Sequence, residues 1–207
     1  MSMPGRNIYK IDLPETFYHV YTRGINKQII FRDTEDFSVF FNLLKRYLGK
    51  KLQKDDQGRV YPNFYDELEI LAFCLMQNHI HLLVYQQSTK AMQSCLRSLL
   101  TSFSVYHNKK YQRRGPVFES RYRASLIDRD DYLLHISRYI HLNPKKWKNY
   151  QYSSLPYYMN HKRASWVRPE KILDLFEQSE SEYIKFVADY EEQKKYQDEL
   201  KTVLAHI

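Results

Sequence analysis

The stretch that decides the fold is LEILAFCLMQNHIHLLVY, residues 68–85. Two runs rich in apolar residues, 68–76 and 79–86, begin in this stretch, and only Gln77 and Asn78 separate them. Short apolar runs joined by two polar residues are typical of a β-hairpin. The stretch therefore predicts two neighbouring antiparallel strands.

The second strand of this hairpin has two faces of different chemistry, because alternate side chains of a strand point to opposite sides. Ile80, Leu82 and Val84 form an apolar face, whereas His79 and His81 stand on the other face. We expect the apolar face to pack beneath helices and the histidines to lie on the open face of the sheet. Two imidazoles on one strand face can bind a divalent cation; two surface histidines without a ligand are the alternative.

The segments around the hairpin complete an α+β pattern. Aromatic and β-branched residues that end at a glycine predict a strand over 16–24. Apolar residues at helical spacing predict helices over 33–50, 89–111 and 128–144, and a turn leads into a further strand within 113–127. The order β-α-β-β-α-β-α contains the split βαβ, ferredoxin-like arrangement, an antiparallel sheet with two helices on one face.

Composition favours a polyanionic partner. Lysine and arginine number 32 against 24 acidic residues, so the net charge is +8, and the chain has 19 tyrosines and 11 phenylalanines. Cations interleaved with aromatic rings suit phosphates and unstacked bases, although rings of the core and ordinary solvated cations show the same composition. Two cysteines, Cys74 and Cys95, suit a reducing compartment. With no signal peptide and no membrane span in the sequence, we expect a cytoplasmic protein.

The predicted third helix places further polar side chains on one side. Within LLHISRYIHLNP, residues 133–144, three residues lie at i, i+4 and i+8 and project together: His135, Tyr139 and Asn143. Apolar residues that can anchor the helix fall on the opposite side: Leu133, Ile136 and Ile140. A tyrosine between two metal-capable side chains is a candidate nucleophile, and a packing residue is the alternative.

Other residues compete for these roles. Tyr106 lies on the second predicted helix beside a basic run and is a rival nucleophile, with packing or phosphate contact as its expected role. His19 shares its strand face with Phe17 and Tyr21 and either supports the site or lines the strand. For His135 and His141 the sequence does not decide between tuning the site and simple helix surface.

Four blocks in this order and spacing, FYHVYTRG, MQNHIHLLV, GPVFESRYRA and RYIHLNP, resemble the single-tyrosine HUH transposases of insertion sequences, most of all the REP-associated tyrosine transposases. The resemblance spans residues 16–158. It implies that His79, His81 and Asn143 bind a divalent metal, Mg²⁺ or Mn²⁺, and that Tyr139 attacks DNA. The implied enzyme is a DNA strand transferase that cleaves and rejoins single-stranded DNA through a 5′-phosphotyrosine. The implied partners are single-stranded or hairpin DNA, with the protein acting as a monomer or a homodimer.

A basic segment, NKKYQRRG at 108–115, is the candidate DNA-binding patch. Four of its cations surround a tyrosine, and the following strand adds two arginines on one alternating face: Lys109, Lys110, Tyr111, Arg113, Arg114, Arg121 and Arg123. Cations beside an aromatic ring suit phosphate contact with base stacking, and a solvated basic loop is the alternative.

The chain divides into a predicted catalytic domain, residues 1–158, and a C-terminal accessory region, residues 159–207, where an amphipathic helix is expected from about Pro169. A second hypothesis keeps the same sheet but without catalysis: a module that binds single-stranded nucleic acid. A two-histidine phosphoesterase is disfavoured because only one His-x-His doublet, at 79–81, is present.

Overall fold

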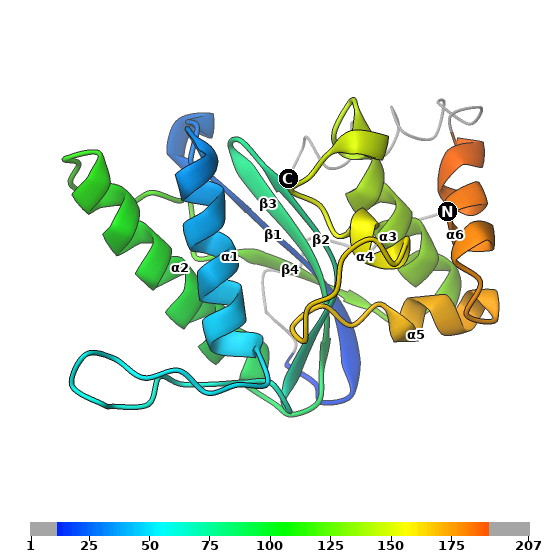
Figure 1. Cartoon of the computed structure of the whole chain (residues 1–207), viewed down its shortest axis with the longest axis horizontal. Helices are drawn as coiled ribbons and strands as arrows, with labels where there is room; N and C mark the ends of the chain where they lie inside the picture. Colours follow the sequence, from blue (N-terminus) through cyan, green and yellow to red (C-terminus); the bar gives the residue numbers. More distant parts are fainter. Residues whose placement is uncertain (1–11, 191–207) are drawn as a thin grey trace.

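The computed structural model describes residues 12–190, and a four-stranded sheet stands at its centre between two layers of helices (Figure 1). The chain runs in the predicted order through β1 Thr16–Arg23, α1 Thr34–Leu48, β2 Leu68–Met76, β3 His79–Gln86, α2 Ala91–Lys110, β4 Arg123–Ile127 and α3 Asp130–Leu142. Short 3₁₀ turns lie at Ile25–Lys27, Trp147–Asn149 and Asp174–Phe176.

The strand order is β2-β3-β1-β4, and every neighbouring pair is antiparallel. This is the order of the split βαβ, ferredoxin-like arrangement, so the predicted α+β fold class is confirmed. The hairpin turns at Gln77 and Asn78, as the sequence predicts, and β1 then lies directly against β3. The central position of β1 brings its own side chains beside the two histidines.

One face of the sheet packs on α1 and α2. Ile80, Leu82 and Val84 of β3 are buried there with apolar side chains of both helices, as alternation predicts. The start of α1 is fixed by a capping box, in which the Asp33 side chain accepts from the backbone N–H of Asp36 and the Asp36 side chain accepts in return.

The expectation of an open second face is wrong. That face carries a second core, in which Leu83 packs with α3 and with three further helices, α4 Leu155–Tyr158, α5 Glu170–Leu173 and α6 Glu180–Ala188. The predicted anchors Leu133, Ile136 and Ile140 of α3 are all buried in it. Helices therefore stand on both sides of the sheet in Figure 1.

Within the described residues, the segment after Tyr158 is not the single helix expected from Pro169, and the part of that expectation that falls on residues 191–207 lies outside the described range. It breaks between α5 and α6 because Glu177 and Gln178 have positive φ angles, a conformation that ends a helix. Tyr183 and Val187 of α6 are buried in the second core, against the same helix that carries Tyr139. None of the helices in the described range is long and apolar enough to cross a bilayer.

Candidate active site

His79 and His81 stand at the start of β3, on the face that meets α3. The ladder sets Arg23 of β1 opposite His79 and Tyr21 opposite His81. The two imidazole centroids are 5.0 Å apart with nearly perpendicular planes. His81 is 3% exposed, so it is an interior side chain and not the surface residue expected for an open sheet face.

The end of α3 brings Tyr139 and Asn143 to these histidines. Asn143 Oδ1 lies 3.1 Å from His79 Nε2, although 64 residues separate the two in sequence. The Tyr139 ring stands edge-on to His81, with centroids 5.3 Å apart and planes at 88°. Of the three polar residues predicted to share a helix side, His135 does not reach the site and contacts Arg138 instead. The other two meet the histidine pair within a single chain.

Burial dominates the electrostatics of this cluster. It lowers the pKa of His79; Asn143, whose side chain accepts a hydrogen bond from the protonated ring, opposes this shift, and the Arg23 charge reinforces it. It also lowers the pKa of His81 well below the usual value, with further contributions from the neighbouring histidines. Both imidazoles are therefore neutral at pH 7 and each keeps one lone pair.

The phenol of Tyr139 responds to burial in the opposite direction. Burial raises its pKa to about 12, the neighbouring Tyr21 adds to the shift, and hydrogen bonding to Asn143 opposes it. The neutral phenol is thus the resting form of Tyr139. Its ionisation requires a compensating positive charge.

The donor set around His79 fits a cation. Asn78 donates its amide N–H to the Lys27 carbonyl, which turns its Oδ1 toward His79 Nδ1 at 2.6 Å, so Nδ1 carries the imidazole proton. His79 Nε2 then faces Asn143 Oδ1 at 3.1 Å with a lone pair on each side. A cation held by these two atoms would turn the contact from repulsive to bonding.

Asn143 is essential to this fit. Within residues 12–190, no group of three His, Cys, Asp or Glu side chains is arranged to hold a metal. The amide oxygen would therefore complete the set that His79 and His81 begin. An oxygen donor with two imidazoles suits Mn²⁺, and Mg²⁺ to a smaller extent.

β1 contributes three residues to this face that the sequence did not assign to the site. His19, Tyr21 and Arg23 share the histidine face, and the Arg23 guanidinium carbon lies 5.4 Å from the Tyr21 ring centroid. Arg23 Nε and the Tyr21 hydroxyl are buried, and neither makes a hydrogen bond of regular geometry within the described residues. Burial raises the pKa of the Tyr21 phenol, and the nearby Arg23 guanidinium partly opposes this shift. The alternation of FYHVYTRG is the signal that places all three on one face.

His141, whose role the sequence left open, lies outside the cluster. Its two ring nitrogens contact Tyr183 Oη at 2.7 Å and Ser154 Oγ at 2.6 Å. It is fully buried, and it joins α3 to the segments that follow. Its role is structural.

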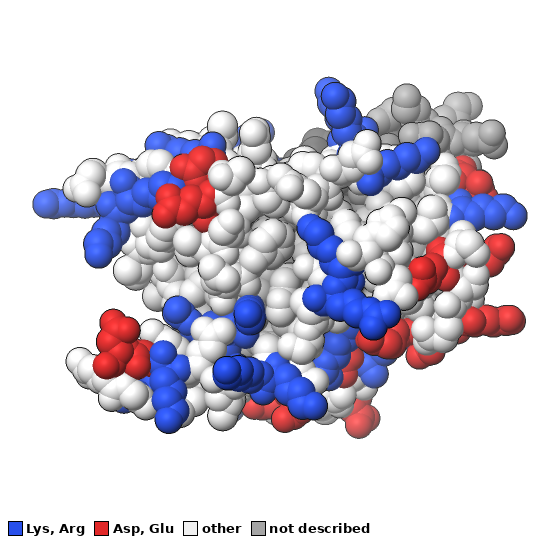
Figure 2. All heavy atoms as spheres, viewed as in Figure 1, with Lys and Arg blue, Asp and Glu red and all other residues white. Residues whose placement is uncertain are grey.

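The candidate DNA-binding residues fall into two groups. Lys110 pairs with Asp33, Glu35 and Asp36 at the start of α1, and the Tyr111 hydroxyl donates to Asp36 at 2.7 Å. These two side chains therefore fasten α2 to α1, and Figure 2 shows acidic and basic side chains gathered at that end of the molecule.

The remaining cations of the patch form no ion pair in the described part of the chain. Lys109, Arg114 and Arg121 are exposed, and Arg113 and Arg123 are half-buried. Arg123 pairs in register with Tyr21 of β1, on the histidine face. The rival nucleophile Tyr106 donates to Asp36 at 2.9 Å, on the opposite side of the sheet from His79.

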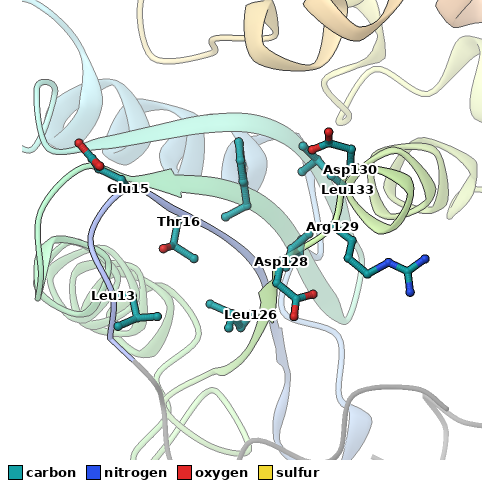
Figure 3. Close-up of a pocket in the computed structure, with 10 residues that line it drawn as sticks. Leu13, Glu15, Thr16, Leu126, Asp128, Arg129, Asp130 and Leu133 are labelled. Atoms are coloured by element: carbon teal, nitrogen blue, oxygen red, sulfur yellow. The ribbon is translucent and has the colours of Figure 1, made fainter.

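A pocket at the opposite end of β1 and β4 is unsuited to DNA. Its lining includes three carboxylates, from Glu15, Asp128 and Asp130, and one guanidinium, from Arg129 (Figure 3). It lies at the start of α3, whereas Tyr139 lies near the end of that helix. Its negative charge would repel a phosphate backbone.

Comparisons with known proteins find similarities to transposases. Residues 63–143 match the family model for IS200-like transposases, a stretch that includes all four residues of the cluster. The structure is similar, with a TM-score of 0.54, to a solved structure of a REP-associated tyrosine transposase bound to a REP hairpin. The identity is 14%, and the match covers 81% of this chain and 92% of the other. A search of the curated proteins finds no match.

The resemblance expected from the four sequence blocks is confirmed: the chain is similar to the IS200-like transposases over residues 63–143 and, in its fold, to a REP-associated tyrosine transposase.

Proposed function

We propose that this protein cleaves and rejoins single-stranded DNA in the manner of a transposase, through a covalent 5′-phosphotyrosine on Tyr139. One observation carries the proposal: Tyr139 and Asn143 of α3 lie against His79 and His81 of β3 within one chain. Packing alone does not require two neutral imidazoles, an amide oxygen and a phenol to converge at one point.

In the cleavage step, Tyr139 Oη attacks the scissile phosphorus, so that a P–Oη bond forms and the P–O3′ bond breaks. The phenolic proton passes to water, and the departing oxygen takes up a proton to become a 3′-hydroxyl. In the rejoining step, a second 3′-hydroxyl attacks the phosphotyrosine and Tyr139 regains its proton. The number of phosphodiester bonds is conserved, so no ATP is consumed.

The raised pKa of Tyr139 sets how strongly the site must stabilise the ionised phenol. With a pKa of about 12, roughly one phenol in 10⁵ is ionised at pH 7, which corresponds to about 7 kcal/mol. His79, His81 and Asn143 would hold a divalent cation, which would supply Lewis-acid polarisation of the phosphate. The Asn143 side chain also acts to lower the pKa of this phenol, so we propose that it supports the nucleophile as well as contributing an oxygen.

We propose hairpin-flanked single-stranded DNA as the substrate. Support comes from the similar solved transposase, which is bound to a REP hairpin, and from the net charge of +8. Arg23 and Arg123 lie on the histidine face, where a phosphate backbone would cross the site. Since the four residues converge within one chain, we propose that a monomer is sufficient for cleavage.

The direct test is formation of a covalent adduct. The full chain is incubated with Mn²⁺ and a labelled hairpin-flanked single strand, and denaturing electrophoresis reports the protein–DNA adduct. We expect Tyr139→Phe to abolish the adduct. Tyr132→Phe is the matched control, because Tyr132 lies at the opposite end of α3, and it should form the adduct as the wild type does.

The outcomes separate the two candidate functions. An adduct that persists in Tyr139→Phe would show that another residue is the nucleophile. The non-catalytic nucleic-acid-binding module would be favoured if the protein binds DNA but forms no adduct, and if His79→Ala does not change its Mn²⁺ binding.

A further inference from the structure

His19 makes a contact with the histidine pair that the proposed chemistry leaves unexplained. Its Nε2 lies 3.0 Å from His81 Nδ1, and both side chains are buried, 5% and 3% exposed. The two rings are nearly parallel, at 14°, with centroids 5.2 Å apart. His19 stands one strand away from His81, on a diagonal of the β1–β3 ladder.

A hydrogen bond between two imidazole nitrogens needs one proton between them. Burial lowers the pKa of both rings, that of His19 to about 4, so each ring carries a single N–H at pH 7. Either His81 Nδ1–H donates to His19, or His19 Nε2–H donates to His81. In the first case His81 keeps its Nε2 lone pair, and in the second its only N–H is on Nε2.

The two cases differ in their consequence for the cation. A ring protonated on Nε2 and bonded through Nδ1 has no lone pair left to offer, whereas a ring protonated on Nδ1 presents Nε2. His79 is already protonated on Nδ1, because the side-chain oxygen Oδ1 of Asn78 accepts from its Nδ1–H at 2.6 Å. A metal-binding histidine commonly donates its other N–H to a fixed acceptor.

We infer that His19 is a positioning residue: it accepts the Nδ1–H of His81, as Asn78 accepts that of His79, and so turns both Nε2 lone pairs toward one cation. The inference rests on the proposed metal-dependent function. It assigns to His19, within the block FYHVYTRG, a role that is separate from strand packing. Pure packing is the competing explanation, since His19 also stands edge-on to Tyr139 at 6.1 Å.

The tautomers can be measured in the metal-free protein, without DNA. Long-range ¹H–¹⁵N NMR spectra distinguish Nδ1–H from Nε2–H imidazoles. We expect His79 and His81 of the wild type to be Nδ1–H tautomers. A His81 protonated on Nε2 in the wild type would overturn the inference, whether or not the protein cleaves DNA.

Mn²⁺ titration of substituted proteins provides the second readout. His19→Phe keeps the ring volume but removes the acceptor, and we expect it to weaken Mn²⁺ binding about 10- to 100-fold. His19→Gln restores an acceptor and should bind within about threefold of the wild type. Wild-type affinity in a folded His19→Phe protein would refute the role, and circular dichroism reports whether that protein is folded.

His107→Phe is the matched control. His107 is fully buried on α2, and neither of its ring nitrogens has a hydrogen-bond partner in the described structure. Its replacement should leave Mn²⁺ binding unchanged. An equal loss in His107→Phe and His19→Phe would attribute the effect to core disruption and overturn the assignment. Failure of the proposed function is recognised separately, by a wild type that has the expected tautomers but forms no DNA adduct.

Discussion

Replacement of Tyr183 by phenylalanine tests how the C-terminal region holds the helix that carries Tyr139. The Tyr183 hydroxyl lies between α6 and α3, where it accepts from His141 Nδ1–H at 2.7 Å and donates to Ser137 Oγ at 3.2 Å. Ser137 in turn donates to the Leu134 carbonyl at 2.9 Å. On the other side of the imidazole, Ser154 Oγ lies 2.6 Å from His141 Nε2 and 3.2 Å from the Phe73 carbonyl oxygen. The hydroxyls and the imidazole therefore form one buried chain of hydrogen bonds.

The magnitude follows from what the substitution leaves behind. Tyr183→Phe keeps the ring, which stacks on Tyr158 with centroids 4.5 Å apart, but removes the acceptor of a fully buried N–H. A buried donor without a partner costs about 1–3 kcal/mol. Ser137 loses one donor but keeps its own bond to Leu134, so its contribution is smaller. We expect the free energy of unfolding to fall by about 1–3 kcal/mol.

Urea unfolding followed by circular dichroism measures this change. With a slope of about 2 kcal/mol per molar urea, the midpoint should fall by about 0.5–1.5 M. Tyr132→Phe is the control, because the Tyr132 hydroxyl makes no hydrogen bond in the structure of residues 12–190, and it should change stability by less than about 0.5 kcal/mol. Equal midpoints for the two variants would refute the reasoning.

Three further expectations concern charge, metal and pH. Arg23→Gln should weaken single-strand binding and reduce the slope of log K against log salt by about one, whereas Arg59→Gln, whose guanidinium pairs with Asp55, should leave the slope unchanged in a fluorescence-anisotropy titration. Chelation by EDTA should abolish the covalent adduct and excess Mn²⁺ should restore it; an adduct of full yield in EDTA would exclude a metal requirement. Burial raises the pKa of Asp36, but hydrogen bonds from Arg32 N–H, Tyr111, Lys110 and Tyr106 outweigh it and hold that pKa below its usual value. The ionised Asp36 therefore stabilises the folded state above its unfolded-state pKa of about 4, and this contribution is lost as the pH falls through the folded-state pKa. Tyr111→Phe should therefore lower the free energy of unfolding, measured in urea, by more at pH 7 than at pH 3.

The division of the chain at residue 158 into a catalytic and an accessory part stays a prediction. Ile172, Tyr183 and Val187 share a core with α3. We propose that the accessory part braces the helix of Tyr139.

Local periodicity predicted which residues of the candidate site share a face. Alternation along β3 places His79 and His81 on one face, and the i, i+4 spacing places Tyr139 and Asn143 on one side of α3. These relations depend only on the geometry of one strand or one helix, so they can be read without knowing what packs against it. The cap at Asp33 and the two-residue hairpin at Gln77 and Asn78 are equally local.

The errors arose where a second element decides the outcome. The histidine face was expected to be open, but β2 is buried at every position from Leu68 to Leu75. A strand that is apolar on both faces, apart from Glu69, is typical of a sheet covered on both sides. Lys110 and Tyr111 were expected to contact DNA as part of a basic run. The start of α1 supplies three carboxylates that engage Lys110, one of which also binds Tyr111, and their approach depends on how two helices pack.

The sequence alone determined which side chains share a face and which chemistry each face carries, because those relations follow from the backbone repeat of single elements. Only the tertiary structure decided that the end of α3 meets the start of β3, that His19 and Asn78 occupy the Nδ1 atoms of the histidines, and that the site lies inside two layers of helices. The physical reason is that these contacts join residues on different elements. Their distances depend on how the two cores pack and not on any local pattern.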